Sequence, residues 1–376
     1  MELNVVCFDY PYPPNYGGII DVFFKVKKLN KLGVSIVLHV FTDRVDVDHP
    51  QLKEVSSQIF YYDINKKWYY FFYNKPFSVL TRNHKDLLQN LKLNSSPILF
   101  EGLKSTYCCH DEQLDGRVKL LRYHNIEHDY YNGISKSESN LLKKKIYSLE
   151  ASKYKKYENI LPKFDKVFTL SIFETNHVDL KFGNAKYIPA FHGNKQLQEL
   201  SEWGEYVLYH GDLSISDNIK SVLFLIDAFK RIQTIKFVIA SGNNEALITK
   251  KIKGYNHIKF EKIKDFNHLK QLFKKSHVCV SWSFQQSGTK LKLINALFNS
   301  RFNVVNKNVV DDVSILSICN VVNTKAELVN KVLELMTKPY NDIIINSKQI
   351  VLNSKLSDSN NAKVIKECVK DLVEKN

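Results

Sequence analysis

The chain reads Ser287-Gly288-Thr289-Lys290-Leu291-Lys292-Leu293-Ile294-Asn295-Ala296 directly after a strand-like apolar run, His277–Ser283. This pattern predicts a loop of small residues that opens a helix, with two lysines in its first turns. The first backbone N–H groups of a helix have no partner within it and carry the positive end of its dipole. Together with the lysines they favour an anion, typically a phosphate. We therefore expect this stretch to hold a phosphorylated ligand at the carboxyl end of a strand.

Apolar strands alternate with helices on both sides of this stretch. In the first half, a strand at Leu3–Phe8 precedes a helix at Ile19–Leu32, which Gly33 would end. In the second half, Tyr206–His210 and Lys236–Ala240 show the same strand pattern, with a helix between them. Continuous apolar strands joined by helices are typical of a parallel sheet covered on both faces. The sequence therefore predicts an α/β protein.

At 376 residues the chain is longer than one hydrophobic core usually supports, so we expect two domains. The polar stretch Asn194–Gly204 has no clear period and separates two α/β series of similar size. We place an N-terminal domain at residues 1–193 and a C-terminal domain at residues 194–355. Residues 356–376 contain a final amphipathic helix, predicted over Ser357–Glu374, that no strand follows.

The chain carries 54 Lys and Arg residues against 39 Asp and Glu residues, a formal net charge of +15. This excess favours an anionic partner, such as nucleic acid, an anionic lipid surface or a phosphate-bearing ligand. Lysine is far more frequent than arginine, so a coding bias toward lysine is an alternative explanation for part of this positive charge. No apolar run approaches the roughly 20 residues that span a bilayer, and Met1–Val5 does not resemble a signal peptide. The six cysteines lack zinc-ligand spacing, so we expect no metal site and a reducing, cytoplasmic compartment.

A pair of glycines, Gly17-Gly18, lies between the first strand and the first helix. In an open parallel sheet, ligands bind at such strand-to-helix turns. Paired glycines let a ligand approach the backbone closely, and the helix start favours a phosphate. The dinucleotide pattern GxGxxG and the P-loop pattern GxxxxGK are both absent, which disfavours a dinucleotide and ordinary P-loop chemistry. A tight turn without a ligand is the alternative.

Polar residues follow the strand that ends at Tyr123, where the chain continues His124-Asn125-Ile126-Glu127-His128. At the carboxyl end of a strand, His124 can supply hydrogen bonds or act as an acid or base toward a substrate. A structural histidine is the alternative. In the second half, Gly211 and Gly242 each follow a strand and would open loops toward a ligand, with Gly242 beside a nucleotide base. Simple turns would give the same pattern.

Two further segments leave their role open. The predicted helix Leu141–Leu161 has an apolar stripe that includes Leu142, Ile146 and Leu149, while six lysines lie largely off it. These lysines form either a solvated face or a docking surface for an anionic membrane. The aromatic run Trp68–Phe77 belongs either to the core or to a surface that contacts an acceptor or the lipid interface.

These motifs, in this order, resemble the GT-B glycosyltransferases, and specifically glycosyltransferase family 4. The resemblance covers nearly the whole chain. It is carried by Pro13-Pro14-Asn15-Tyr16-Gly17-Gly18, Tyr123-His124-Asn125, Tyr209-His210-Gly211-Asp212-Leu213 and Ser287-Gly288-Thr289-Lys290-Leu291-Lys292. It implies two facing Rossmann-like, doubly wound domains, the first binding the acceptor and the second the nucleotide-sugar. It also implies that the final helix crosses back to the first domain.

The resemblance further implies a retaining, metal-independent transfer of a hexose-type sugar from a nucleotide-diphosphate-sugar to a glycan or lipid-linked glycan. It looks most like bacterial surface polysaccharide biosynthesis, in the cytoplasm or at the inner face of the cytoplasmic membrane. No cofactor is implied besides the donor as co-substrate. His124 and Lys290 are implied as catalytic, and Tyr16 and Asn125 as acceptor-binding. The donor-binding residues that it implies are Gly17, Gly18, Gly211, Gly242, Ser287, Gly288, Thr289, Lys292 and Asn295.

The chain departs from the family pattern at two positions. The family usually has an E-x7-E pair, and Ser287 and Asn295 stand at the matching places. An asparagine can hydrogen-bond a ribose hydroxyl, but without charge. This departure motivates a competing hypothesis, a non-catalytic nucleotide- or glycan-binding protein on the same fold. A nucleic-acid-binding protein would suit the net charge, but the chain has no recognisable nucleic-acid motif, so we predict no nucleic-acid partner.

Overall fold

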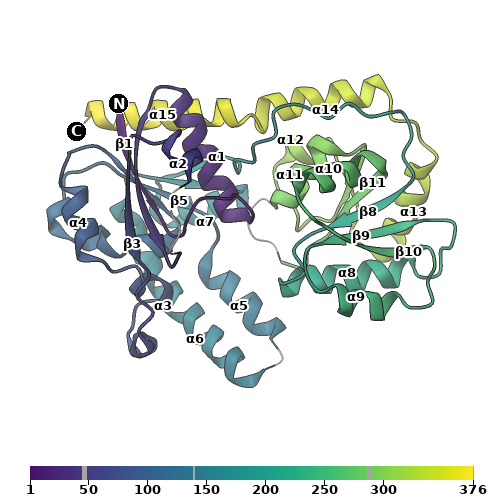
Figure 1. Ribbon diagram of the computed structural model, residues 1–376, viewed down its shortest axis with the longest axis horizontal. Helices are drawn as coiled ribbons and strands as arrows, with labels where there is room; N and C mark the ends of the chain where they lie inside the picture. The colour runs from purple at the N-terminus through teal and green to yellow at the C-terminus, as the bar shows by residue number, and fades with distance from the viewer. Residues whose placement is uncertain (45–48, 139, 286–289, 376) are drawn as a thin grey trace. The chain divides into compact units, whose positions relative to one another are not determined.

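The computed structural model describes residues 1–44, 49–138, 140–285 and 290–375. The chain forms two compact units, and each contains one parallel β-sheet with helices packed on it (Figure 1). Unit 1 consists of Met1–Gly193 together with Ser357–Asn376, and unit 2 consists of Asn194–Leu356. The last helix of the chain therefore belongs to the same unit as the first strand.

Seven strands form the sheet of unit 1, in the order β3-β2-β1-β4-β5-β6-β7. Every neighbouring pair runs parallel. The strands are β1 Glu2–Cys7, β2 Ser35–Thr42, β3 Gln58–Asp63, β4 Ile98–Glu101, β5 Lys119–Tyr123, β6 Lys166–Thr169 and β7 Ala185–Tyr187. The order changes direction between β1 and β4, which is where open α/β sheets bind their ligands.

Helices cover both faces of this sheet. They are α1 Gly17–Lys31, α2 Pro50–Lys53, α3 Phe77–Leu80, α4 Lys85–Leu91, α5 Glu127–Ser137, α6 Leu141–Tyr157, α7 Ile172–Phe182 and α15 Asp358–Lys375. Short 3-10 helices join them: η1 Trp68–Phe72, η2 Leu103–Ser105, η3 Tyr107–His110, η4 Glu112–Leu114 and η5 Glu158–Lys163.

Alternate residues of β1 are buried on opposite faces of the sheet. Leu3, Val5 and Cys7 belong to one apolar cluster, and Val6 belongs to another. Successive side chains of a strand point to opposite faces, so a strand covered on both sides needs apolar residues at nearly every position. This is why Leu3–Phe8 is a continuous apolar run in the sequence.

α1 and α15 pack together over the first of these clusters (Figure 1). Lys366 donates from Nζ to the carbonyl of Leu32 at 2.7 Å, and Lys28 lies 3.0 Å from the Ser359 hydroxyl. The apolar residues that the two helices bury recur at helical spacing: Ile19, Val22, Phe23, Val26, Leu29, Ala362, Ile365 and Val369.

The first part of unit 1 ends at Gly193, whose backbone has a φ of +74°. The Gly193 N–H donates to Asp358 Oδ2 at 2.8 Å, and the His192 N–H donates to Asp358 Oδ1 at 3.2 Å. A Cβ atom at Gly193 would lie 2.2 Å from the ring of Phe24. The first residue of α15 is therefore held at a point where both the backbone conformation and the space favour glycine.

Six strands form the sheet of unit 2, in the order β10-β9-β8-β11-β12-β13, again parallel throughout. They are β8 Tyr206–His210, β9 Phe237–Ser241, β10 Ile258–Lys262, β11 Ser276–Ser281, β12 Phe302–Val305 and β13 Asn320–Val321. The helices are α8 Ser216–Phe229, α9 Glu245–Ile252, α10 Phe266–Lys275, α11 Leu291–Asn299, α12 Val313–Leu316, α13 Lys325–Met336 and α14 Asp342–Lys355.

The strand order of unit 2 changes direction between β8 and β11, as it does between β1 and β4 in unit 1. β8 is likewise buried on both faces, since Val207 and Tyr209 belong to one apolar cluster and Leu208 to another. The prediction of an α/β protein with two doubly wound sheets is therefore confirmed.

Candidate functional site

α1 starts beyond the carboxyl end of β1, after the loop that leads to Tyr16. Gly17 is the first residue of the helix, and the first turn contains neither a side-chain cap from Tyr16 nor an acidic residue. Such a start presents unpaired backbone N–H groups and the positive end of the dipole. A Cβ atom at Gly18 would lie 2.9 Å from the ring of Phe8 and 3.8 Å from His124 Nδ1. The structure thus brings together Gly18 and His124, which are far apart in the sequence.

The imidazole of His124 packs between Phe8 and Glu101. The ring of Phe8 meets it edge-on, with the ring centroids 5.6 Å apart. His124 Nε2 lies 3.3 Å from a carboxylate oxygen of Glu101. Because a carboxylate oxygen accepts hydrogen bonds, Nε2 is the ring nitrogen that donates to Glu101, and Nδ1 is the ring nitrogen on the side of Gly18. His124 can therefore hydrogen-bond a hydroxyl group at the start of α1.

A buried group of charged residues lies behind His124. Lys25 Nζ lies 3.0 Å from Asp21 Oδ2 and 2.8 Å from the Glu101 carboxylate. Arg122 donates to both oxygens of Asp21, from Nε at 2.9 Å and from Nη2 at 2.7 Å. These four side chains are at most 1% exposed. Two carboxylates face two cations, so Lys25 and Arg122 already supply the positive charge that a metal ion would bring to this cluster.

This charged group was not identified from the sequence. Burial acts to raise the pKa of Asp21, but Arg122 and Lys25 hold the pKa of that carboxyl well below its usual range. Asp21 Oδ1 also accepts the Phe191 N–H at 2.8 Å, and Arg122 Nη1 donates to the Ile188 carbonyl at 2.8 Å. A signal that could have revealed this group is present in the sequence, since Asp21 and Lys25 lie four residues apart on the apolar face of the first helix. Charged residues on a buried face are usually paired with one another, so this spacing indicates a buried ion pair.

The two residues predicted to bind an acceptor are beside this site. Tyr16 directly precedes Gly17 and donates its hydroxyl to Asp9 Oδ2 at 2.7 Å. Burial and the hydrogen bond to Asp9 raise the pKa of Tyr16, so its hydroxyl stays protonated. Asn125 is half-buried and follows His124. Their contact with an acceptor stays a prediction.

In unit 2, the loops that follow β8 and β9 are joined by side chains. Asp212 directly follows Gly211, and its Oδ1 accepts a hydrogen bond from Asn243 Nδ2 at 2.8 Å. Asn243 directly follows Gly242. The two glycines that were predicted to open ligand loops therefore lie on neighbouring, linked loops at the carboxyl end of the sheet.

The start of α11 is fixed to β8 by His210. Burial lowers the pKa of His210 to about 4, so the ring is neutral at pH 7. Its Nε2 lies 2.9 Å from the carbonyl oxygen of Lys292 and donates to it. His210 therefore holds the first turn of α11 beside the end of β8.

The ammonium group of Lys292 lies inside unit 2 at the start of α11. Its Nζ donates to Asn218 Oδ1 at 3.0 Å and to the Trp282 carbonyl at 2.9 Å, and it lies 5.3 Å from the centre of the Tyr209 ring. Burial, reinforced by the nearby charge of Lys290, lowers the pKa of Lys292 to about 7. A buried ammonium of this kind is stabilised by an anion, which would raise its pKa again.

The remaining residues predicted for the donor lie around the same helix. Lys290 directly precedes α11, and its carbonyl accepts the Leu293 N–H at 2.8 Å. Asn295 lies one turn into the helix, where its Oδ1 accepts a hydrogen bond from Asn194 Nδ2 at 3.0 Å. The roles of Lys290 and Asn295 as ligand contacts stay predictions. The other three predicted residues lie outside the described residues: Ser287, Gly288 and Thr289.

A second cluster with a carboxylate lies at the start of α5. His128 Nδ1 lies 2.9 Å and His177 Nε2 3.2 Å from Glu158, which also accepts a hydrogen bond from Tyr123 at 2.8 Å. Lys181 Nζ lies 3.5 Å from the same carboxylate, so Glu158 already has a positive partner. The cluster joins α5, η5 and α7, and it supports the segment that follows β5.

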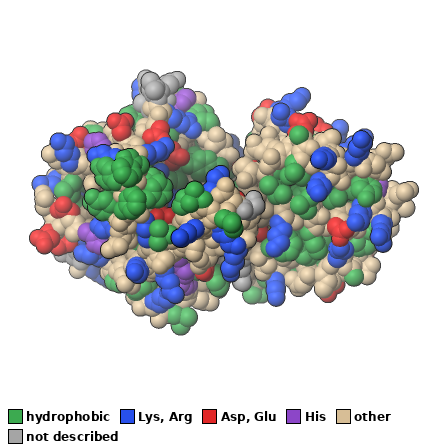
Figure 2. Space-filling view, turned by 90° about the horizontal axis from the view of Figure 1, so that it is seen from below, with side chains coloured by type: hydrophobic (Ala, Val, Ile, Leu, Met, Phe, Trp, Pro, Cys, Tyr) green, Lys and Arg blue, Asp and Glu red, His purple; other side chains and the backbone are tan. Residues whose placement is uncertain are grey.

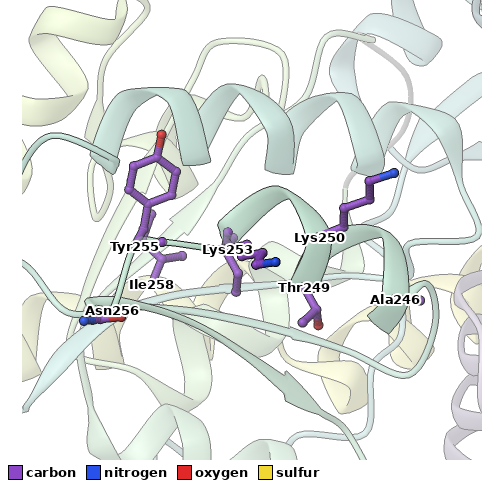
Figure 3. Close-up of a pocket in the computed structure, with 9 residues that line it drawn as sticks. Ala246, Thr249, Lys250, Lys253, Tyr255, Asn256 and Ile258 are labelled. Atoms are coloured by element: carbon purple, nitrogen blue, oxygen red, sulfur yellow. The ribbon is translucent and has the colours of Figure 1, made fainter.

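A pocket of about 650 Å³ opens on unit 2 (Figure 3). Its lining comes from α9 and from the turn that leads to β10, between Ala246 and Ile258. This turn is at the amino end of β10, whereas the predicted ligand residues follow the carboxyl ends of β8, β9 and β11. None of the lining residues is among the residues predicted to bind the donor or the acceptor.

Residues 204–338 match the model of the family described as Glycosyl transferases group 1. The matched range contains the linked loops after β8 and β9 and the whole of α11. A relative from Klebsiella pneumoniae, described as an uncharacterized 44.6 kDa protein in the cps region, is 26% identical over 322 residues. The alignment covers 80% of this chain and 81% of that protein.

Solved structures of glycosyltransferases share the fold. Sucrose-phosphate synthase from Thermosynechococcus elongatus has a TM-score of 0.72 and 14% identity, and the alignment covers 100% of both chains. A TarM variant from S. aureus, solved with fondaparinux, α-GlcNAc-glycerol and UDP, has a TM-score of 0.69 and 12% identity over 98% of this chain and 100% of that chain. The lipopolysaccharide outer core galactosyltransferase WaaB has a TM-score of 0.63 and 12% identity over 97% and 100%. The predicted GT-B fold is confirmed.

The family match and the fold together support sugar transfer from a nucleotide-sugar. The relative in a cps region fits the predicted context of surface polysaccharide biosynthesis. Among the residues that the structure describes, no helix has the length and apolar character that crossing a bilayer requires.

Proposed function

We propose that this chain, which carries a Glycosyl transferases group 1 domain within a GT-B fold, is a retaining hexosyltransferase of the family 4 type. It takes a hexose-type sugar from a nucleoside-diphosphate-sugar and transfers it to a glycan or a lipid-linked glycan. The observation that supports this proposal best is the buried ammonium of Lys292, because it stands at a helix start inside the matched range and an anionic diphosphate would stabilise its charge. We place the reaction in the cytoplasm, with peripheral contact at the inner face of an anionic membrane.

In such a transfer, the bond between the anomeric carbon and the diphosphate oxygen breaks, and a bond from the anomeric carbon to an acceptor hydroxyl oxygen forms. Negative charge develops on the leaving diphosphate. Lys292, Lys290 and the first N–H groups of α11 would stabilise that charge as it develops, which is where fixed positive groups lower a barrier most. These groups supply positive charge without a metal ion, so we propose a metal-independent reaction that needs no cofactor.

His124 has a separate role in this proposal. Its Nδ1 faces Gly18 at the start of α1 and would hydrogen-bond a hydroxyl of the donor sugar. Because Glu101 fixes the other ring nitrogen, the imidazole would not need to reorient when the substrate arrives.

A non-catalytic nucleotide- or glycan-binding protein is the second candidate. The observation that favours it is Asn295, which stands where the family usually has a carboxylate. Its oxygen already accepts a hydrogen bond from Asn194.

The first test is a thermal-shift panel of UDP-, GDP-, ADP- and dTDP-sugars, since a ligand that binds the native state raises its stability in proportion to its affinity. Turnover of the donor that binds is then measured for the wild type, Lys290→Ala and the surface control Lys251→Ala. We expect Lys290→Ala to lose activity and Lys251→Ala to keep the activity of the wild type. A loss of less than about threefold, under roughly 1 kcal/mol, would contradict the role of Lys290. Binding of a donor without hydrolysis or transfer to any acceptor would favour the second candidate.

A further inference from the structure

The aromatic run at residues 68–77 lies largely on the surface of unit 1. Trp68 is 73% exposed and Phe72 is 79% exposed, whereas Tyr70 is buried. The alternative that this run belongs to the core is therefore wrong for Trp68 and Phe72. Soluble proteins rarely leave large apolar side chains gathered in water, and such surfaces usually mark an interaction site.

The amino-terminal half of α6 adds to this exposed surface. Leu141 and Leu142 are 82% and 70% exposed, and Ile146 and Leu149 are exposed as well. Leu142, Ile146 and Leu149 follow one another at spacings of four and three residues, so they lie on one face of the helix. The apolar stripe expected from the sequence is thus present, but its first half faces solvent.

Two contacts join α6 to the aromatic run. Lys153, which continues the spacing of the exposed stripe, donates from Nζ to the Phe71 carbonyl at 2.9 Å. Glu150 Oε2 accepts the Phe77 N–H at 2.8 Å, and Glu150 is itself paired with Lys153 at 2.8 Å. The exposed stripe therefore leads along α6 directly to η1.

We call these exposed side chains the α6 surface: Trp68, Phe72, Leu141, Leu142, Ile146 and Leu149. In Figure 1, α3 and α6 lie at the lower edge of unit 1. Figure 2 views the molecule from that side and shows hydrophobic side chains gathered on unit 1, with Lys and Arg side chains beside them.

Lysines surround the α6 surface. Residues 65–78 and 140–149 contain six lysines and neither aspartate nor glutamate. Lys143 and Lys145 flank the exposed stripe on its two sides, since successive residues turn by about 100° around a helix. Lys67 is exposed next to Trp68, and Lys66 pairs with Asp43. The formal charge of these two ranges is therefore +6, of which the pair between Lys66 and Asp43 offsets one.

We infer that the α6 surface docks unit 1 on an anionic lipid bilayer. Aromatic side chains favour the membrane–water interface, and lysines beside them are attracted to anionic headgroups. A helix with an apolar stripe between lysines suits a position in the plane of that interface. A second copy of this chain is a poorer occupant, because a symmetric contact would bring the same basic surfaces face to face. This inference names the surface that would make the membrane contact proposed above, so it rests on that part of the proposed function. It does not depend on the proposed sugar transfer.

Flotation of the full chain with lipid vesicles tests this inference. We expect the wild type to float with vesicles of phosphatidylcholine plus phosphatidylglycerol and not with phosphatidylcholine alone. Reversing three charges, in Lys143→Glu/Lys144→Glu/Lys145→Glu, should lower partitioning by about a hundredfold or more. Trp68→Ser/Phe72→Ser should lower it by at least about tenfold. The matched control reverses three lysines of unit 2, in Lys250→Glu/Lys251→Glu/Lys253→Glu, and should float like the wild type.

Three results would overturn the inference: a wild type that does not float, α6-surface variants that float as well as the wild type, or a dimer that Trp68→Ser/Phe72→Ser abolishes. Thermal unfolding of each variant shows that it is folded. The same variants are tested for the thermal shift with the nucleotide-sugar. A variant that loses flotation but keeps this shift supports the inference independently of catalysis. A wild type that floats but binds no nucleotide-sugar supports the docking surface and contradicts the proposed donor.

Discussion

His124 Nε2 lies 3.3 Å from the carboxylate of Glu101, and that carboxylate lies 2.8 Å from the ammonium of Lys25. A histidine held through one ring nitrogen presents the other in a fixed direction, here toward Gly18. Glu101 is fully buried, so it acts on a ligand only through His124. It is a positioning residue, and His124 is the group that meets the substrate in the proposed reaction.

We expect His124→Ala to lower turnover by roughly tenfold to a hundredfold, because a hydrogen bond to the reacting sugar is lost. The thermal shift with the nucleotide-sugar should persist, because Lys292 lies in the other unit. Steady-state kinetics with the identified donor measure the effect, and His268→Ala on α10 is the matched control. Unchanged turnover would assign His124 a purely structural role.

The pH dependence of activity should report Lys292. Its pKa of about 7 means that the ammonium loses its proton just above neutral pH, and a neutral amine cannot stabilise a diphosphate. We therefore expect kcat/KM for the donor to fall as the pH rises above about 7. An arginine stays charged well above neutral pH, so in Lys292→Arg the decrease in kcat/KM should begin at a higher pH than in the wild type. An identical alkaline limb in both proteins would rule out Lys292 as its source.

Asp21→Asn should destabilise unit 1 by about 3–5 kcal/mol, because it leaves Arg122 and Lys25 buried with one carboxylate fewer. The pKa of Asp21 is lowered in the folded state, so this carboxyl contributes stability above its unfolded pKa of about 4. That contribution is lost as the pH falls through the folded-state pKa. Urea denaturation between neutral and acid pH measures both effects. The exposed control Asp371→Asn should change the unfolding free energy by less than about 0.5 kcal/mol. Equal effects of the two substitutions would contradict the network.

Gly193→Ala should destabilise more than Gly116→Ala. Both glycines have a positive φ, near +75°, which costs a residue with a Cβ atom about 1–2 kcal/mol. Only at Gly193 would the new atom meet the Phe24 ring, at 2.2 Å, because the space around Gly116 is open. Denaturation of both single variants isolates the clash. In a double-mutant cycle with Phe24→Ala, the cost of Gly193→Ala should fall toward that of Gly116→Ala.

The sequence predicted the central strands well because burial on both faces forces a continuous apolar run, as in β1 and β8. It missed β3, β10 and β13, which lie at the edges of the two sheets. β10 reads Ile-Lys-Phe-Glu-Lys and is only partly buried, so nothing in its composition requires a strand. The start of α1 was predicted at Ile19 and lies two residues earlier, at Gly17. Gly33, which was expected to end this helix, follows its last turn and has a φ of +79°.

Those residues of the candidate site that follow a strand could be predicted from the sequence. Gly18 and His124 follow β1 and β5, and the topology brings such ends to one edge of the sheet. The pairing of Asp21 with Arg122 was not predictable, because it depends on which helix face meets β5 and on the path of the chain after β7. The burial of Lys292 was also not predicted, because a lysine at the start of a helix is usually exposed. Only the structure shows that Asn218 and the Trp282 carbonyl accept hydrogen bonds from its ammonium group.

The packing of α15 on α1 has a consequence for synthesis of the protein. Unit 2 is an insertion between Gly193 and Ser357, so the ribosome completes it before the last segment of unit 1 exists. Domains generally fold in the order of synthesis, but here the unit that begins first is completed last. Until α15 emerges, the apolar groups that it covers on α1 stay open to water. A nascent chain that stalls before Ser357 therefore exposes a hydrophobic surface to which chaperones can bind.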